Sequence, residues 1–233
     1  MSVRVVSGEI RAKTATTRVV IPTVAQPRWP PFERVAETIA TPQRRFPPHR
    51  HEGVEVLTYV VEGSGSHEFE SHPPTALVQG STFVLAAPTP VSHTITPGKG
   101  QTVRWFAVVA ALPPGKLSAP RLQSHRAEPT AVQADGTTVR HLVGPSSPLT
   151  SLAGLESQEI VFRAPGTSFR KVGHDRIAVC YAFSGRGAVD NEGLDAGEAA
   201  LVEEAGGIAI AGQTGFHVVL VSAPQARERV TSS

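Results

Sequence analysis

Short apolar segments alternate with turn residues along nearly the whole chain. The segments are rich in Val, Ile and aromatic residues, and most of them end at Gly, Pro, Ser or Asp. This pattern is typical of β-strands that are joined by turns. It predicts strands at 3–6, 17–22, 54–62, 81–87, 102–112, 137–143, 157–164, 176–183, 199–204, 207–212 and 216–223. Short strands at such regular spacing indicate a β-sandwich or a β-barrel.

Evidence for helices is thin. Residues 31–40 are compatible with one or two helical turns, but Pro30, Pro31 and Pro42 surround them and restrict helix formation. The longest purely apolar run, 105–112, reads as a buried strand, because a helix needs about 20 apolar residues to span a bilayer. We therefore expect an all-β protein without a membrane partner.

Composition and charge narrow the class of protein further. The 233 residues are 40% hydrophobic and 18% charged, which is enough apolar material for a core and excludes a disordered chain. The net charge of +2 argues against direct binding of nucleic acid, for which a concentrated basic face is expected. The single cysteine, Cys180, excludes an internal disulfide and a Cys-based zinc cluster. With no apolar leader at the N-terminus, these features predict a cytoplasmic protein.

The chain divides into two similar halves. Residues 113–129 are rich in proline, lack periodicity and are predicted to be a linker. The modules on either side, 1–112 and 130–233, share one order of features: a strand, a Gly-x-Gly turn, a second Gly turn, and two further apolar strands. This order indicates an internal duplication of one β module.

Three histidines of the first module are candidate metal ligands. His49 and His51 lie in FPPHRHEGVEVLTYVVEG (46–63), and because alternate side chains of a strand share a face, they can project into one cavity. His93 follows the next apolar strand, and an antiparallel barrel can bring it opposite the pair. Neutral imidazoles that lie so close together form a natural metal site.

The second module lacks these residues. Alignment of the Gly turns of the two modules places non-matching residues at all three positions: Lys171 for His49, Gly173 for His51 and Ile210 for His93. We therefore expect the C-terminal module to bind no metal and to act as a scaffold.

The first half resembles the pirin family of bicupins. The resemblance rests on FPPHRHEGVEVLTYVVEG, on the HEFESH segment at 67–72, and on the segment from Gly80 to His93 with its spacing. It implies an all-β fold of two tandem cupin (jelly-roll-like) β-barrels, with one metal ion, usually iron, in the N-terminal barrel only. His49, His51 and His93 match three of the family's four ligands. The fourth ligand, a glutamate two residues after the last histidine, falls on Ile95 here, which cannot bind a metal.

Two replacements for the missing glutamate remain open. Glu55 follows His51 by four residues, the spacing of the additional glutamate in many other cupins, and has the same strand parity as the histidines. A straight strand would place it about 13 Å from His51, so a bend at Gly53 would be needed. The alternatives are that Glu55 is hydrogen-bonded to a neighbouring loop, or that water completes a three-histidine site.

The resemblance also suggests surroundings for the site. Strand parity assigns Leu57, Tyr59, Phe83 and Ile95 to the cavity wall. His67 and His72 lie on the turn after the metal strand, where an outer-sphere or exposed role is expected rather than ligation.

The implied function is that of a mononuclear metal-dependent dioxygenase of the quercetin-2,3-dioxygenase type. Such an enzyme would use one divalent ion, Fe(II) or another first-row metal, and a small aromatic or flavonol-like substrate. Two other functions stay open at this point. The chain could be a non-catalytic metal or redox sensor that binds a partner protein, as some pirins do, or a degenerate cupin without metal.

Overall fold

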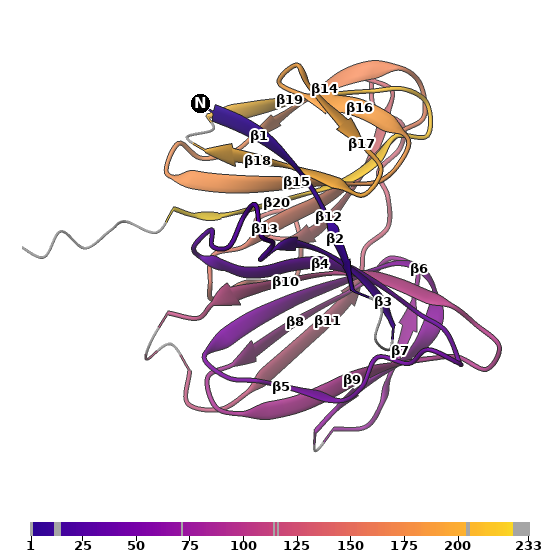
Figure 1. Cartoon of the computed structure of the whole chain (residues 1–233), viewed down its shortest axis with the longest axis vertical. Helices are drawn as coiled ribbons and strands as arrows, with labels where there is room; N and C mark the ends of the chain where they lie inside the picture. The colour runs from indigo at the N-terminus through magenta and orange to yellow at the C-terminus, as the bar shows by residue number, and fades with distance from the viewer. Residues whose placement is uncertain are drawn as a thin grey trace, which may run out of the picture.

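The computed structural model describes residues 2–11, 15–70, 72–113, 115, 117–203 and 206–225. All regular secondary structure in these residues is β-strand, as predicted. Figure 1 shows two stacked groups of curled sheets: the indigo to magenta strands of the first half lie below the orange and yellow strands of the second, except for β1 (Ser2–Ser7), which lies in the upper group. None of the described residues form a helix long and apolar enough to cross a membrane.

The first half of the chain builds a ten-stranded antiparallel sheet that curls on itself. Its main path runs in the order β11-β8-β6-β10-β4-β3-β2, while β5, β7 and β9 pair off this path with β6 and with one another. The strands are β2 (Glu9–Arg11), β3 (Thr16–Ile21), β4 (Phe32–Ala40), β5 (His49–His51), β6 (Val54–Phe69), β7 (Thr75–Val78), β8 (Ser81–Ala87), β9 (Val91–Pro97), β10 (Val103–Ala111) and β11 (Arg121–Arg126).

The second half contributes most of two further sheets. The six-stranded sheet has the order β1-β18-β15-β20-β13-β12, and the four-stranded sheet has the order β14-β19-β16-β17. The strands are β1 (Ser2–Ser7), β12 (Thr137–Val143), β13 (Glu156–Phe162), β14 (Gly166–Lys171), β15 (Arg176–Ser184), β16 (Arg186–Val189), β17 (Glu192–Asp195), β18 (Glu198–Glu203), β19 (Gly207–Gly212) and β20 (His217–Pro224).

Three segments differ from the expectations drawn from sequence. Residues 31–40, for which helical turns were considered, form the central strand β4, whose backbone pairs with β3 on one side and β10 on the other. Part of the predicted linker 113–129 forms β11, an edge strand that pairs with β8. Strand β1 lies in the sheet of the other half, where it pairs with β18 (Figure 1). The sheets therefore do not end at the predicted module boundaries. A strand of the first module joins a sheet of the second half, and a strand of the predicted linker joins the sheet of the first half.

Strands β4, β6 and β10 present alternate residues to two different environments. One set of side chains, which includes Val35, Leu57 and Phe106, packs against residues of the second half in a shared core. The other set faces a cavity inside the first half. The period of two in a β-strand thus places the contact between the two halves on one face of this sheet and the cavity on the opposite face.

Two reciprocal hydrogen bonds connect the halves across the shared core. The Tyr59 hydroxyl donates to the Glu159 carboxylate at 2.5 Å, and the Tyr181 hydroxyl donates to the Glu37 carboxylate at 2.8 Å. All four residues are buried. Because each half supplies one tyrosine and one glutamate, the contact has the symmetry that an internal duplication predicts.

Candidate metal centre

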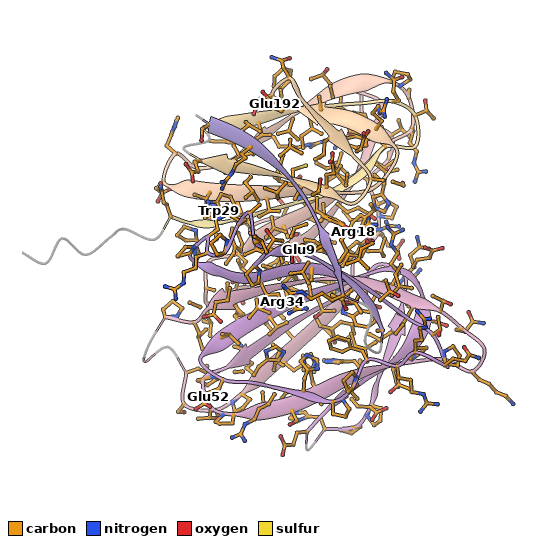
Figure 2. All side chains as sticks on the ribbon, in the orientation of Figure 1. Glu9, Arg18, Trp29, Arg34, Glu52 and Glu192 are labelled. Carbon is orange, nitrogen blue, oxygen red and sulfur yellow. The ribbon has the colours of Figure 1, made fainter. Side chains whose placement is uncertain are left out.

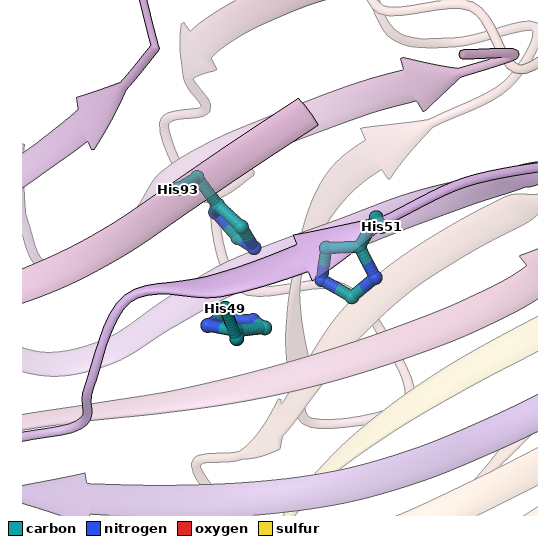
Figure 3. Close-up of side chains that lie close together, drawn as sticks. All are labelled: His49, His51 and His93. Atoms are coloured by element: carbon teal, nitrogen blue, oxygen red, sulfur yellow. The ribbon is translucent and has the colours of Figure 1, made fainter. Parts of the chain in front are cut away.

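The three histidines lie on neighbouring antiparallel strands. Strand β5 carries His49 and His51 and pairs with β9, in which His93 lies directly opposite His49. The ring centroids are 4.8 Å apart for His49 and His51, 4.3 Å for His49 and His93, and 5.0 Å for His51 and His93. One ring nitrogen of each histidine lies within 4.8 Å of the others. Figure 3 shows the three rings turned toward one another.

The hydrogen bonds of these rings leave nitrogens free at the centre of the group. His49 Nδ1 lies 3.2 Å from the carbonyl oxygen of Pro47, so this nitrogen donates and Nε2 keeps its lone pair. His51 Nε2 and His93 Nε2 are buried and have no hydrogen-bond partner among the described residues. Buried polar atoms without a partner are uncommon in proteins. Three imidazole nitrogens arranged in this way fit a first-row metal ion.

The environment keeps these histidines neutral. Burial is the largest cause of the low pKa of His93, which is about 2, and the nearby His49 lowers it further. Burial, followed by His49 and Arg34, lowers the pKa of His51 to about 4. The pKa of His49 is also lowered, chiefly by burial. Since an unperturbed histidine titrates near pH 6.5, all three are in the neutral form that binds metals at neutral pH.

A fourth histidine contacts the group from behind. His67 lies on β6 directly opposite Ile95 of β9, and it is 2% exposed. Its Nε2 is 2.7 Å from Nδ1 of His93. If His93 binds a metal through Nε2, its Nδ1 carries the proton and donates it to His67. The outer-sphere alternative considered for His67 agrees with this position, whereas His72 is exposed.

Glu55 is not brought to the three histidines. Its side chain is fully buried, and its carboxylate accepts hydrogen bonds from the second half of the chain: from Leu152 N at 3.0 Å, from Ala153 N at 2.9 Å and from the hydroxyl of Ser151. Gly53 has a φ of +69°, which interrupts the strand between His51 and Glu55. His51 and Glu55 therefore do not share a face, although their spacing in sequence predicts that they do. Of the alternatives left open for Glu55, the structure shows the hydrogen-bonded contact with a neighbouring loop.

A cavity of about 300 Å³ opens beside the histidines. Apart from the three histidines, the residues that line it are mostly apolar, and one of them is charged. They are Arg34, Ala36, Thr38, Phe46, Val56, Thr58, Ile95, Trp105, Ala107 and Val109. Of the four residues expected to line it, only Ile95 does so. Leu57 and Tyr59 belong to the shared core instead, because the break at Gly53 turns the even-numbered residues of β6 toward the cavity. Phe83 does not line the cavity but packs behind its wall, in a buried cluster that includes Ile95 and Trp105.

The corresponding positions of the second half carry other side chains. Lys171 ends β14, Gly173 follows it, and Ile210 lies within β19. Among the residues that the structure describes, the group of His, Cys, Asp or Glu that could hold a metal is His49, His51 and His93. The absence of metal from the second module stays a prediction.

The chain is similar to known proteins in both sequence and structure. Residues 35–143 match the family model of the AraC-like ligand binding domain. A pirin-like protein from Caulobacter vibrioides is 29% identical over 161 residues, which are 65% of this chain. The match spans 58% of the length of that relative.

Two solved structures have the same fold over nearly the whole chain. A quercetin 2,3-dioxygenase from Acinetobacter baumannii is 18% identical with a TM-score of 0.82, covering 95% of this chain and 79% of the other. The bacterial pirin YhhW from Escherichia coli, in complex with nickel(II), is 15% identical with a TM-score of 0.79, covering 97% of this chain and 100% of the other. The predicted resemblance is confirmed: the chain has the fold of the pirin-like bicupins, with two tandem cupin β-barrels.

Proposed function

We propose that the chain binds one divalent first-row metal ion, Fe(II) in the first instance, through His49, His51 and His93. The observation that carries this proposal is the set of buried ring nitrogens that have no other partner and converge beside an apolar cavity. The nickel(II) complex of the bacterial pirin supports it, because that protein shares the fold. Glu55 is left out of the ligand set, since its carboxylate is engaged by the loop of the second half.

We further propose that the cavity is the active site of a dioxygenase of the quercetin-2,3-dioxygenase type. A first-row ion with open coordination positions supplies Lewis-acid and redox chemistry toward O₂ and a substrate oxygen. The chain contributes the surroundings. Phe46 and Trp105 supply aromatic surface for a flat substrate, and the apolar wall excludes water. His67 accepts a hydrogen bond from His93 Nδ1, so the proton stays on Nδ1 and Nε2 is free to bind the metal.

Elemental analysis and oxygen uptake test this proposal together. Protein purified without chelator is expected to contain one metal ion per chain, and the metal-loaded protein is expected to consume O₂ in the presence of quercetin. Two metal ions per chain would contradict the assignment of the site to the first module alone. One metal ion without turnover would leave a metal-binding protein that is not this dioxygenase, and a metal-free protein that cannot be loaded would contradict the metal site itself.

Replacement of His67 by Phe is expected to weaken metal binding about 10- to 100-fold, because partners of this kind orient a ligand and raise its basicity. Phe replaces the imidazole with a slightly larger aromatic ring and removes the hydrogen bond to His93. The affinity of the apo-protein for Co(II), measured by titration calorimetry, reports the effect. His72→Phe is the matched control, since His72 is exposed and its Nδ1 donates to the nearby carbonyl oxygen of Glu70. Unchanged affinity in His67→Phe would mean that His93 is oriented by its strand alone.

Replacement of Ile95 by Glu is expected to tighten metal binding and to lower the reduction potential of bound iron. Ile95 lines the cavity, and a carboxylate there would add a negative charge that favours the oxidised ion. Calorimetry measures the affinity and voltammetry the potential. Ile95→Gln separates charge from size. Loss of affinity in both variants would mean that Ile95 serves the apolar packing of the buried cluster in which it lies with Phe83 and Trp105.

A further inference from the structure

The cavity beside the histidines contains one cation and no carboxylate. Arg34, Ala36 and Thr38 are alternate residues of β4, and all three line the cavity. Figure 2 labels Arg34 in the lower half of the molecule, and it lies opposite Val109 of β10, another lining residue. The lining includes no Asp or Glu. The positive charge of Arg34 therefore has no counter-charge on the wall of the cavity.

Arg34 also lacks an acidic partner elsewhere in the part of the chain that the structure describes. No carboxylate of these residues lies within the 4.0 Å of a salt bridge to its guanidinium. The side chain is half-buried, and its pKa is lowered first by burial and then by the nearby Arg11. Buried arginine is ordinarily paired, because removing a guanidinium from water without an anion is unfavourable. The positive charge of Arg34 is therefore not balanced by a carboxylate of the described residues.

A bound metal ion would increase the excess of positive charge in the cavity. Imidazole ligands bring no negative charge to a metal ion, and the other residues that line the cavity include no carboxylate. A divalent ion would add two positive charges near the charge of Arg34, because Arg34 lines the same cavity as His49, His51 and His93. A ligand that brings negative charge would bind more favourably in such a site than a neutral ligand of the same shape.

We propose that this cavity also binds a small organic carboxylate with an apolar or aromatic body, whose charge is balanced by Arg34 and the metal ion. The inference rests on the proposed metal site and goes beyond the proposed dioxygenase activity, because a flavonol carries no carboxylate. The apolar side chains of Val56, Trp105 and Val109 contact the body of the ligand, and Arg34 donates charge-assisted hydrogen bonds to its carboxylate. The cavity volume of about 300 Å³ is at the small end of ligand sites, which favours a body of one ring.

The test compares two probes of nearly equal shape, benzoate and benzamide, on Co(II)-loaded protein by titration calorimetry. Benzoate is expected to bind at least tenfold more tightly than benzamide. Arg34→Gln is expected to weaken the binding of benzoate about tenfold and to leave the affinity for benzamide unchanged. Arg34→Lys is expected to recover part of the lost affinity for benzoate. Arg50→Gln is the control, because Arg50 lies between His49 and His51 on β5 but is exposed, and its effect is expected to stay within twofold.

Two outcomes would overturn the inference: equal binding of benzoate and benzamide, or full retention of benzoate affinity in Arg34→Gln. The Co(II) content of every variant is measured in parallel and is expected to equal that of the unaltered protein. If the protein binds no Co(II), the proposed metal site fails. The comparison of the two probes on the apo-protein and on Arg34→Gln then still decides whether Arg34 recognises an anion.

Discussion

His93→Ala is expected to abolish stable metal binding. His93 is the most buried of the three histidines, it lies opposite His49, and it is the ring that His67 contacts. Its loss would leave two ligands on one short strand, which is fewer than the three protein ligands of a typical open metal site. After incubation with Co(II) and gel filtration, elemental analysis is expected to find about one ion per chain in the unaltered protein and less than about a tenth of that in the variant.

His125→Ala is the matched control for this variant. His125 is an exposed residue of the edge strand β11, and its removal is expected to leave the metal content unchanged. Urea unfolding of both variants verifies that each is folded. A His93→Ala protein that retains a full equivalent of Co(II) would refute the three-histidine site.

Glu55→Ala is expected to destabilise the protein by about 2–5 kcal/mol, the cost of leaving several buried hydrogen-bond donors without their charged acceptor. The donors are the backbone N–H groups of Leu152 and Ala153 and the hydroxyl of Ser151. The Ser151 oxygen also accepts from Leu155 N at 2.8 Å, so the whole 151–155 loop is ordered around this carboxylate. The free energy of unfolding, obtained from urea titration of the apo-protein, measures the loss.

Glu52→Ala provides the comparison for this variant. Glu52 is exposed, and Figure 2 shows it at the lower edge of the molecule. Its replacement is expected to change the free energy of unfolding by less than about 0.5 kcal/mol. The metal affinity of Glu55→Gln, a variant that keeps the size of the side chain, is expected to stay within about threefold of the unaltered protein. A much larger loss of metal affinity would assign Glu55 to the metal after all.

The strands with the clearest apolar pattern could be predicted from sequence, because they form the buried centre of each sheet. Strands such as β16 (Arg186–Val189) and β17 (Glu192–Asp195) could not, since they are short and carry few apolar residues. Strand β11 has three exposed residues out of six, and its identity depends on pairing with β8, a contact that no local pattern reveals.

The grouping of the three histidines could be predicted because His49 and His51 share one short strand and His93 follows the next apolar strand at a characteristic spacing. The position of Glu55 could not, because one glycine with a positive φ reverses which residues of β6 face the cavity. The same reversal explains why Leu57 and Tyr59 were assigned to the wrong side. Arg34 was missed because residues 31–40 were not identified as a strand. Without that assignment, the alternate residues of β4 could not be placed on the wall of the cavity.

The position of β1 has a consequence for the order in which the protein can be completed during synthesis. Residues Ser2–Ser7 pair with β18, and the hydroxyl of Ser2 donates to Glu203, which is 201 positions later in the chain. Strand β1 is therefore synthesised long before the strand with which it pairs. Until β18 has been made, the chain carries an unpaired strand of the kind that recruits the edges of other chains. Slow translation of the second half would prolong that exposure, so β1 is a strand at which newly made copies of the protein are open to misassembly.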